Sequence, residues 1–252
     1  MAAETSEPSL DAFLNGRFHL WQSATGLRAG HDALLVAAAV PAEAAGRAID
    51  MGAGTGAVGF ASALRAPALH VVLAEREPTL LHLLRRSVDT APEPLGARLS
   101  VAEIDLLSRR PEREEAGLCD GAFDWVVTNP PFHPANGRLS PDAMRARALT
   151  MPDPAFLSRW VAVAATLLRS GGRFIALGRP ENLPVVLAAA DNRLGSMAIL
   201  PIHNEGRRAH RVLVTAVRGS RAPLRILPSF QLDDSARRQL SAGDALPVPV
   251  LE

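Results

Sequence analysis

The stretch from Asn129 to Phe132 carries groups suited to gripping a planar amino group. It reads Asn129-Pro130-Pro131-Phe132 and follows an apolar run, residues 123–128, that is typical of a buried strand. The Asn129 side-chain oxygen and the Pro130 carbonyl can each accept one hydrogen of an amine. The two prolines stiffen the turn, because each fixes its own φ and restricts its predecessor. Phe132 offers a ring on which a base can stack, a contact worth about 1–3 kcal/mol.

A site that holds an amine by two hydrogen-bond acceptors suits group transfer to the amine nitrogen. An aromatic exocyclic amine is a poor nucleophile because its lone pair is delocalised, and two acceptors on its hydrogens favour a pyramidal nitrogen. No strong general base is needed, since positioning alone can supply roughly 7–11 kcal/mol. The competing interpretation of Asn-Pro-Pro by itself is an ordinary turn.

A glycine-rich turn upstream has the composition of a nucleotide-binding loop. It follows a short apolar run at 47–51, precedes a helical segment at 57–65, and reads Asp50-Met51-Gly52-Ala53-Gly54-Thr55-Gly56. Glycines let the chain turn tightly and let a ligand approach the backbone. The helix that follows offers its N-terminal amides and the positive end of its dipole.

Two carboxylates end the next two predicted strands. Glu75 closes the apolar run at 70–75 and is suitably placed for a pair of ribose hydroxyls. Asp105 follows the run at 98–104, where it could accept a hydrogen bond from an adenine amino group. A tight turn that binds nothing would not require either carboxylate, so the turn is interpreted as a nucleotide site.

A dinucleotide site competes for the same glycines. Gly54, Gly56 and Gly59 also satisfy G-x-G-x-x-G, and Glu75 has nearly the spacing of about 20 residues expected there. However, Asp50 would be unfavourable beside a pyrophosphate and suits the positive amino group of S-adenosylmethionine. The Asn-Pro-Pro-Phe stretch has no evident use in hydride transfer. The pattern therefore favours S-adenosylmethionine.

Strands and helices alternate along the chain, which predicts an α/β, doubly wound, mostly parallel seven-stranded sheet covered on both faces. The predicted strands are 47–51, 70–75, 98–104, 123–128, 173–177, 197–201 and 209–217. The last two have no helix between them and predict an antiparallel edge hairpin. Predicted helices are 33–40 with Asp32 as its N-cap, 57–65, 79–88, one that starts at Asp153-Pro154 and stops at Gly171-Gly172, and 184–191.

The chain is expected to form one domain over 1–252, with a flexible tail at 1–12 and a mobile substrate loop at 133–153. It has 252 residues, 48% of them hydrophobic, and a formal net charge of +1. Its single cysteine excludes an intrachain disulfide, and residues 107–121 look irregular.

No secretory signal and no long apolar span is evident, so a cytoplasmic location without membrane association is expected. The histidines show no ligand spacing, so no metal is expected.

Arginines gather near the end of the chain, where residues 207–225 hold no acidic residue. A charged strand edge is one interpretation and an RNA phosphate-contact surface is the other. The arginines proposed to contact RNA are Arg207, Arg208 and Arg211, with Arg145 from the loop.

Together these motifs resemble class I S-adenosylmethionine-dependent methyltransferases of the small-domain type, which have a Rossmann-like fold. The segments 14–35, 140–145 and 211–224 are closest to the bacterial tRNA(Val) adenine-N6 methyltransferase family, and the resemblance covers nearly the whole chain. It implies Asp50, Gly52 and Gly54 around the methionine part of the cofactor, with Gly56 in the same turn. It also implies Glu75 on the ribose, Asp105 on the adenine and Asn129 to Phe132 around the target amine.

The resemblance also implies a cofactor role for Asp32, although His31 stands where many relatives have threonine. Its leading implication is methylation of adenine N6 in RNA, with tRNA as partner. Phe132-His133 is similar to ribosomal-RNA guanine-N2 methyltransferases, which keeps that substrate open. A protein glutamine-N5 methyltransferase uses the same kind of Asn-Pro-Pro site and remains a third candidate. A binding module without catalysis is disfavoured because no motif position is visibly damaged.

Overall fold

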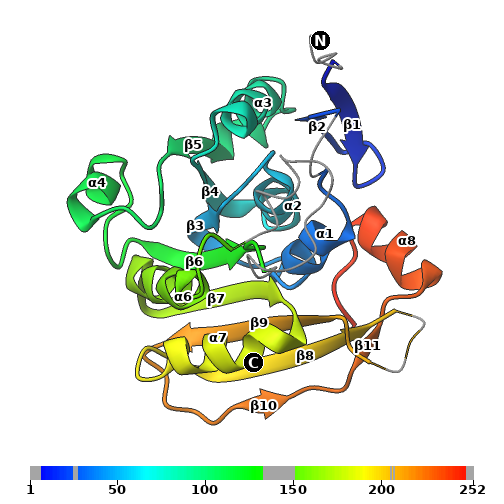
Figure 1. The fold of residues 1–252 in the computed structure, drawn as a ribbon. Helices are drawn as coiled ribbons and strands as arrows, with labels where there is room; N and C mark the ends of the chain where they lie inside the picture. The colour runs from blue at the N-terminus through cyan, green and yellow to red at the C-terminus, as the bar shows by residue number, and fades with distance from the viewer. Residues whose placement is uncertain (1–6, 25–27, 133–150, 205, 207, 248–252) are drawn as a thin grey trace, which may run out of the picture.

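The structure is a computed structural model that describes residues 7–24, 28–132, 151–204, 206 and 208–247 (Figure 1). Within these residues the main sheet has nine strands, and seven longer ones run in the order β8-β9-β7-β6-β3-β4-β5. The sheet strands are β3 (Ala45–Met51), β4 (Ala68–Glu75), β5 (Leu99–Glu103), β6 (Phe123–Thr128), β7 (Leu168–Gly178), β8 (Leu194–His203), β9 (Arg211–Arg218), β10 (Arg225–Ile226) and β11 (Phe230–Gln231).

The predicted α/β sheet with its late antiparallel pair is confirmed. β9 runs antiparallel to both β7 and β8, whereas the pairs joining β7, β6, β3, β4 and β5 are parallel. Two short segments were not predicted, because β10 and β11 have only two residues each and pair with β8 through backbone bonds. A separate hairpin joins β1 (Ser9–Phe13) to β2 (Phe18–Gln22).

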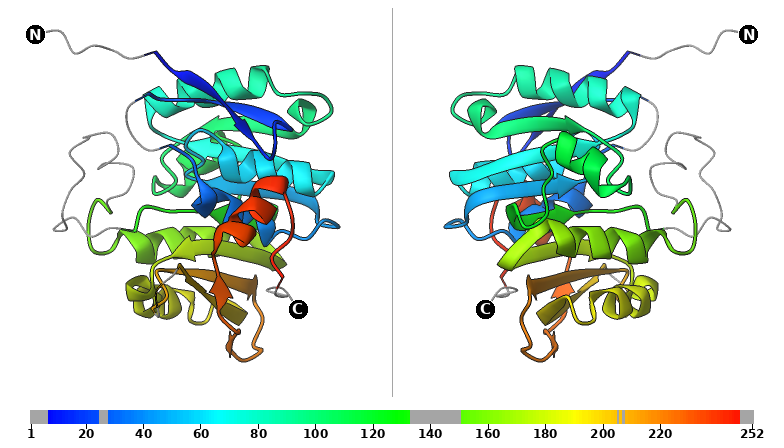
Figure 2. Two further views of the ribbon diagram at one scale, coloured as in Figure 1. Left: turned by 90° about the vertical axis from the view of Figure 1, so that its right-hand side faces the viewer. Right: turned by 90° about the vertical axis from the view of Figure 1, so that its left-hand side faces the viewer.

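Helices cover both faces of the sheet, as the apolar runs require (Figure 2). Residues of α1 and α2 belong to one buried cluster, and residues of α6 and α7 belong to a second cluster. The helices are α1 (His31–Ala38), α2 (Ala57–Arg65), α3 (Pro78–Asp89), α4 (Arg110–Glu115), α6 (Phe156–Leu167), α7 (Leu183–Ala190) and α8 (Asp234–Ala242), with 3-10 turns at Gly96–Arg98 and Pro180–Asn182.

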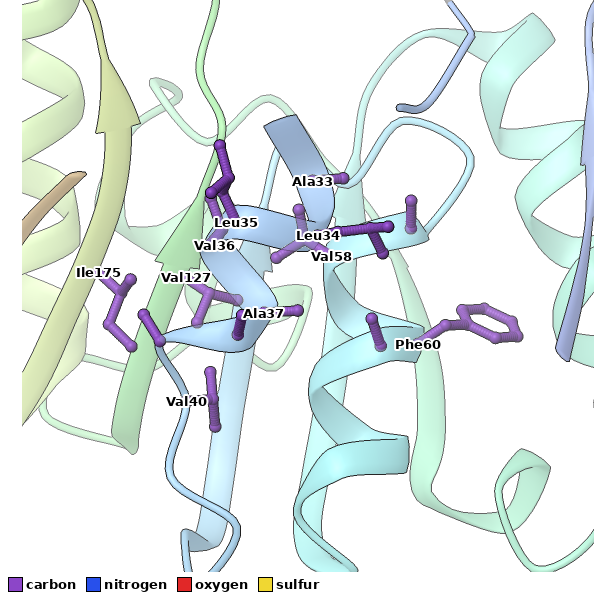
Figure 3. Packing of buried hydrophobic residues seen from close by; sticks show 14 of the residues in the cluster. Ala33, Leu34, Leu35, Val36, Ala37, Val40, Val58, Phe60, Val127 and Ile175 are labelled. Carbon is purple, nitrogen blue, oxygen red and sulfur yellow. The ribbon is translucent and has the colours of Figure 1, made fainter. Parts of the chain in front are cut away.

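Helix α1 is the alanine-rich helix expected from sequence, and it is buried against two neighbours. Figure 3 shows Leu34 beside Val58 of α2 and Ala37 beside Val127 of β6. Small side chains allow this close approach, so α1 is fixed between α2 and the sheet. The first turn of α1 therefore has a fixed position near the strand ends.

Several local predictions were wrong. Gly30, not Asp32, is the N-cap residue of α1, and no side chain caps this helix. Residues 9–12, predicted as tail, form most of β1, because their backbone pairs antiparallel with β2. The region at 107–121 contains α4, where Arg110 pairs with Glu114 one turn later at 2.6 Å.

The boundaries of α6 also differ from the prediction. The helix begins at Phe156, and Asp153 precedes it with Oδ1 accepting from the Ala155 amide at 2.9 Å. It ends at Leu167, and β7 starts at the next residue, so Gly171-Gly172 lie within the strand rather than at a helix stop. Helix α8 was missed. Its Asp233 cap accepts from the Ala236 amide at 2.8 Å.

Candidate active site

Neighbouring strands β3 and β6 bring the two main motifs to one edge of the sheet. Met51 pairs with Thr128 in parallel register, and the Thr128 hydroxyl donates to the Met51 carbonyl at 2.8 Å. The glycine turn leaves β3 after Met51, and Asn129 follows Thr128 directly. Strand order reverses between these two strands, which is where open α/β sheets bind ligands.

The glycine turn has the backbone shape that its composition predicts. Gly52, Gly54 and Gly56 all have positive φ values, of 71°, 59° and 100°. The amides of Gly52 and Ala53 both donate to the Ala74 carbonyl, at 3.0 and 2.9 Å, which anchors the turn on the end of β4. A Cβ atom added to Gly54 would meet no atom within 4 Å, so this part of the turn borders open space that a ligand can enter.

Asp50 lies beneath the turn and is buried, with 1% of its surface exposed. Its Oδ2 accepts from the Gly59 amide at 2.8 Å, so it ties the turn to α2. Its Oδ1 is buried and has no hydrogen-bond partner within the described residues. Burial raises the pKa of Asp50 to about 7, and the nearby charge of Glu75 adds to the shift. A second amine or amide donor at this point would satisfy the free oxygen.

Glu75 and Asp105 both lie at the same edge, as predicted. Glu75 is 8% exposed, and its Oε2 accepts from the Gly54 amide at 2.8 Å while Oε1 accepts from the next two amides of its own loop. Asp105 accepts from Arg76 at 2.8 Å and from the Leu107 amide at 2.9 Å, and 44% of its side chain is exposed. Glu75 thus shapes the turn, and Asp105 faces solvent beside it.

The Asn129–Phe132 turn is partly enclosed. The Asn129 Oδ1 atom is buried and lacks a hydrogen-bond partner within the described part of the chain. Pro130 is buried and Pro131 is half-buried. Phe132 keeps only 3% of its surface exposed, so the open stacking face expected from sequence is not present in this structure.

Of the four predicted arginines, the structure describes Arg208 and Arg211, and their surroundings differ. Arg145 and Arg207 lie outside the described residues. Arg208 is exposed. Arg211 is instead paired with Asp32 at 3.0 Å and lies over the Phe132 ring, so it is not a free phosphate contact. Asp32, predicted as a cofactor ligand, makes this pair at the same edge of the sheet.

Two further residues border the site although neither was predicted to lie there. Trp160 of α6 donates from Nε1 to the Thr128 hydroxyl at 3.1 Å, and a Cβ on Gly52 would lie 3.3 Å from its ring. Asn182, with Pro130 and Phe132, lines an apolar pocket between α6, α7 and the sheet. Trp160 lies on the buried face of α6, and no local pattern in the sequence indicates that this face meets the turn.

Within the described ranges, no group of three or more histidine, cysteine, aspartate or glutamate side chains could hold a metal ion. No helix in this part of the chain is both long and apolar enough to cross a bilayer.

The burial of Asp50 gives a testable pH dependence. Because its pKa is raised in the folded protein, the folded state retains a proton that the unfolded chain releases above the ordinary aspartate range. The contribution of protonated Asp50 to the free energy of unfolding is therefore complete at low pH. It is lost as the pH rises towards about 7. We expect Asp50→Asn, which mimics the neutral form, to gain stability relative to wild type over this range.

The difference in unfolding free energy should change by up to roughly 1.4 kcal/mol per pH unit. Urea unfolding of both proteins across this range measures it. A difference between the two proteins that does not change with pH would contradict the assignment.

Comparison with known proteins identifies the family. Residues 23–185 match the family described as Methyltransferase small domain. A tRNA1(Val) (adenine(37)-N6)-methyltransferase of Shewanella sediminis is 24% identical over 205 residues, which cover 81% of this chain and 82% of that protein. A release factor glutamine methyltransferase of Mycolicibacterium smegmatis is 37% identical over 131 residues, covering 50% of this chain and 43% of that protein.

Solved structures agree with this assignment. A crystal structure described as a predicted O-methyltransferase of Agrobacterium tumefaciens has a TM-score of 0.69 and 32% identity, and the match covers 85% of this chain and 97% of that chain. A T. thermophilus 16S rRNA N2 methyltransferase, solved with AdoMet and guanosine, has a TM-score of 0.56 and 16% identity, covering 86% and 46%, and shares the fold. This chain belongs to the methyltransferase small domain family.

Proposed function

We propose that this protein transfers a methyl group from S-adenosylmethionine to the exocyclic amine of a base in RNA, with adenine N6 of a tRNA as the acceptor. The observation that carries the proposal is the free Oδ1 of Asn129. It is buried within the described structure without a hydrogen-bond partner, one residue beyond the strand that pairs with the glycine-turn strand. A buried amide oxygen without a donor is costly unless a ligand supplies one.

The residues of the turn fit the methyl donor. Open space beside Gly54 admits a ligand, and the free Oδ1 of Asp50 suits a positively charged amino group. Glu75 ends β4, Asp105 lies two residues beyond the adjacent strand β5, and the two carboxylates suit hydroxyl and amino donors. Glu75 would have to exchange its Gly54 amide contact for the ribose hydroxyls. When bound, S-adenosylmethionine supplies an electrophilic methyl group on a sulfonium.

The chain's own residues then act by positioning. Asn129 Oδ1 and the Pro130 carbonyl each accept a hydrogen bond from the acceptor amine. These two bonds orient the nitrogen lone pair towards the glycine turn. Trp160 holds Thr128, and thereby the start of the turn, through the 3.1 Å bond to its hydroxyl. The apolar pocket beside Pro130 and Phe132 keeps water from the back of the turn.

The relatives support an RNA acceptor. Several proteins named tRNA1(Val) (adenine(37)-N6)-methyltransferase match about four fifths of the chain, at 24–29% identity. A second candidate acceptor is a protein glutamine, favoured by the 37% identity to the release factor enzyme over half of the chain. The structural neighbours are named for two other acceptors, a guanine N2 amine and an oxygen atom. An experiment must therefore distinguish methylation of these acceptors from methylation of adenine N6 and of a protein glutamine.

We expect Asn129→Ala to lower the methylation rate by about 100-fold, as for other small losses of acceptor geometry. The assay transfers a labelled methyl group from S-adenosylmethionine to total tRNA, total ribosomal RNA and release factor, followed by nuclease digestion and mass spectrometry of the nucleosides. N6-methyladenosine from tRNA is the expected product.

Asn192→Gly is the matched control, because Asn192 lies in a turn with a positive φ of 59° beyond α7 and is exposed. It should retain wild-type activity. Label found only in protein, a 2′-O-methyl product, or equal activity of Asn129→Ala would each refute the proposal in its stated form.

Arg208 is the described, exposed member of the arginine group and should contact RNA phosphate. Charge reversal in Arg208→Glu should weaken tRNA binding and reduce the slope of log affinity against log salt by about one. Filter-binding titrations over a series of salt concentrations measure both quantities.

The affinity for S-adenosylmethionine should not change in Arg208→Glu. The control variant is Arg110→Glu, since Arg110 is an exposed arginine on α4 that pairs with Glu114 and Asp120. An unchanged salt slope for Arg208→Glu would show that this surface does not bind RNA.

A further inference from the structure

Arg211 is fixed beside the transfer site by contacts from every guanidinium nitrogen. Its Nε and Nη2 atoms each lie 3.0 Å from Oδ2 of Asp32. Its Nη1 donates to the His210 carbonyl at 3.0 Å. The guanidinium carbon lies 4.9 Å from the centroid of the Phe132 ring. A planar guanidinium bound in this way has little freedom to rotate, so its position over the ring is defined.

Topology explains why an arginine far along the chain reaches this site. β9 runs antiparallel to β7, so its first residue, Arg211, lies at the edge where the parallel strands end. Asp32 lies in the first turn of α1, which is buried against α2 and the sheet. The pair joins residues 179 positions apart in sequence. Only 21% of the Arg211 side chain and 31% of the Asp32 side chain are exposed, so water screens their interaction less than at an open surface.

We infer that Arg211 is a positioning residue for methyl transfer: Asp32 fixes its guanidinium, and the guanidinium fixes the Phe132 ring at the end of the Asn129–Phe132 turn. This inference rests on the proposed function, because it takes the turn as the holder of the acceptor amine. It also changes the role of Asp32, which acts through Arg211 rather than by binding the cofactor.

The turn is thereby held at both ends. At its start, Thr128 bonds to Met51 and accepts from Trp160. At its end, Phe132 packs under Arg211 and against the apolar pocket. Asn129 lies between these anchors with its Oδ1 still free for a donor, within the described residues. Loss of the second anchor should leave the amide free to swing, which lowers the fraction of bound acceptors in a reactive geometry.

The test uses Arg211→Met, which keeps most of the side-chain length, Arg211→Lys, which keeps the charge, and Asp32→Asn. Single-turnover methylation of tRNA at saturating S-adenosylmethionine should be roughly 10-fold to 100-fold slower in Arg211→Met and Asp32→Asn. The double variant should be no slower than the slower single variant, because both act through one contact. Cofactor affinity should stay within about twofold of wild type, since neither side chain binds it.

The Phe132 ring can be followed without any activity. Labelling the eight phenylalanines with 4-fluorophenylalanine gives a fluorine spectrum in which Phe132→Leu identifies the Phe132 signal. That signal should shift in Arg211→Met, shift less in Arg211→Lys, and stay in place in Arg110→Met. Arg110 pairs with Glu114 on α4 and serves as an exposed arginine control.

The outcomes separate the inference from the proposed function. Wild-type protein that methylates no RNA refutes the proposed function, and the fluorine signal still decides whether Arg211 holds Phe132. An active wild type with an unshifted Phe132 signal, or with a normal rate in Arg211→Met, overturns the inference. Weakened cofactor binding in Asp32→Asn but not in Arg211→Met would assign Asp32 to the cofactor instead.

Discussion

Parallel pairing of β3 with β6 is the constraint on which the site depends. The Met51–Thr128 register, closed by the 2.8 Å hydroxyl bond, fixes where both motifs leave the sheet. A slip of one residue would turn Asn129 to the opposite face and carry it away from the glycine turn. Trp160 fastens the same junction from α6, since it contacts Thr128 by hydrogen bond and abuts Gly52. The glycine turn and the Asn129–Phe132 turn are thus parts of one rigid junction.

Two buried polar atoms at this junction lack a hydrogen-bond partner within the described residues, which lowers the stability of the fold. Asp50 is buried with an oxygen that no described residue satisfies, and burial raises its pKa. Asn129 has the same deficit on the other strand. Such unsatisfied atoms are rare in folded proteins and cluster where ligands bind. The well-packed helices α1 and α6 on either face hold the strands that carry these two residues.

Sequence alone predicted the seven longer strands of the sheet and most of the helices between them, because apolar periodicity is local. β6 was predicted with its observed bounds, Glu75 ends β4 as predicted, and Asp105 lies two residues beyond the end of β5. Side-chain contacts between segments that are distant in the sequence could not be predicted from it. Neither the Asp32–Arg211 pair nor the closeness of Trp160 to the glycine turn has a local signal, since each depends on how whole helices pack. The N-cap of α1 was misplaced for the same reason, because Asp32 is engaged by Arg211 from β9.

The central claim is that the glycine turn holds S-adenosylmethionine while Asn129 serves only the acceptor. Isothermal titration calorimetry with S-adenosylmethionine tests it directly on wild type, Glu75→Gln and Asn129→Ala. The account predicts one site in wild type, affinity lowered by roughly 10-fold to 100-fold in Glu75→Gln because a charged hydrogen bond is lost, and wild-type affinity in Asn129→Ala. Absence of binding to wild type, or equal affinity in Glu75→Gln, would contradict it.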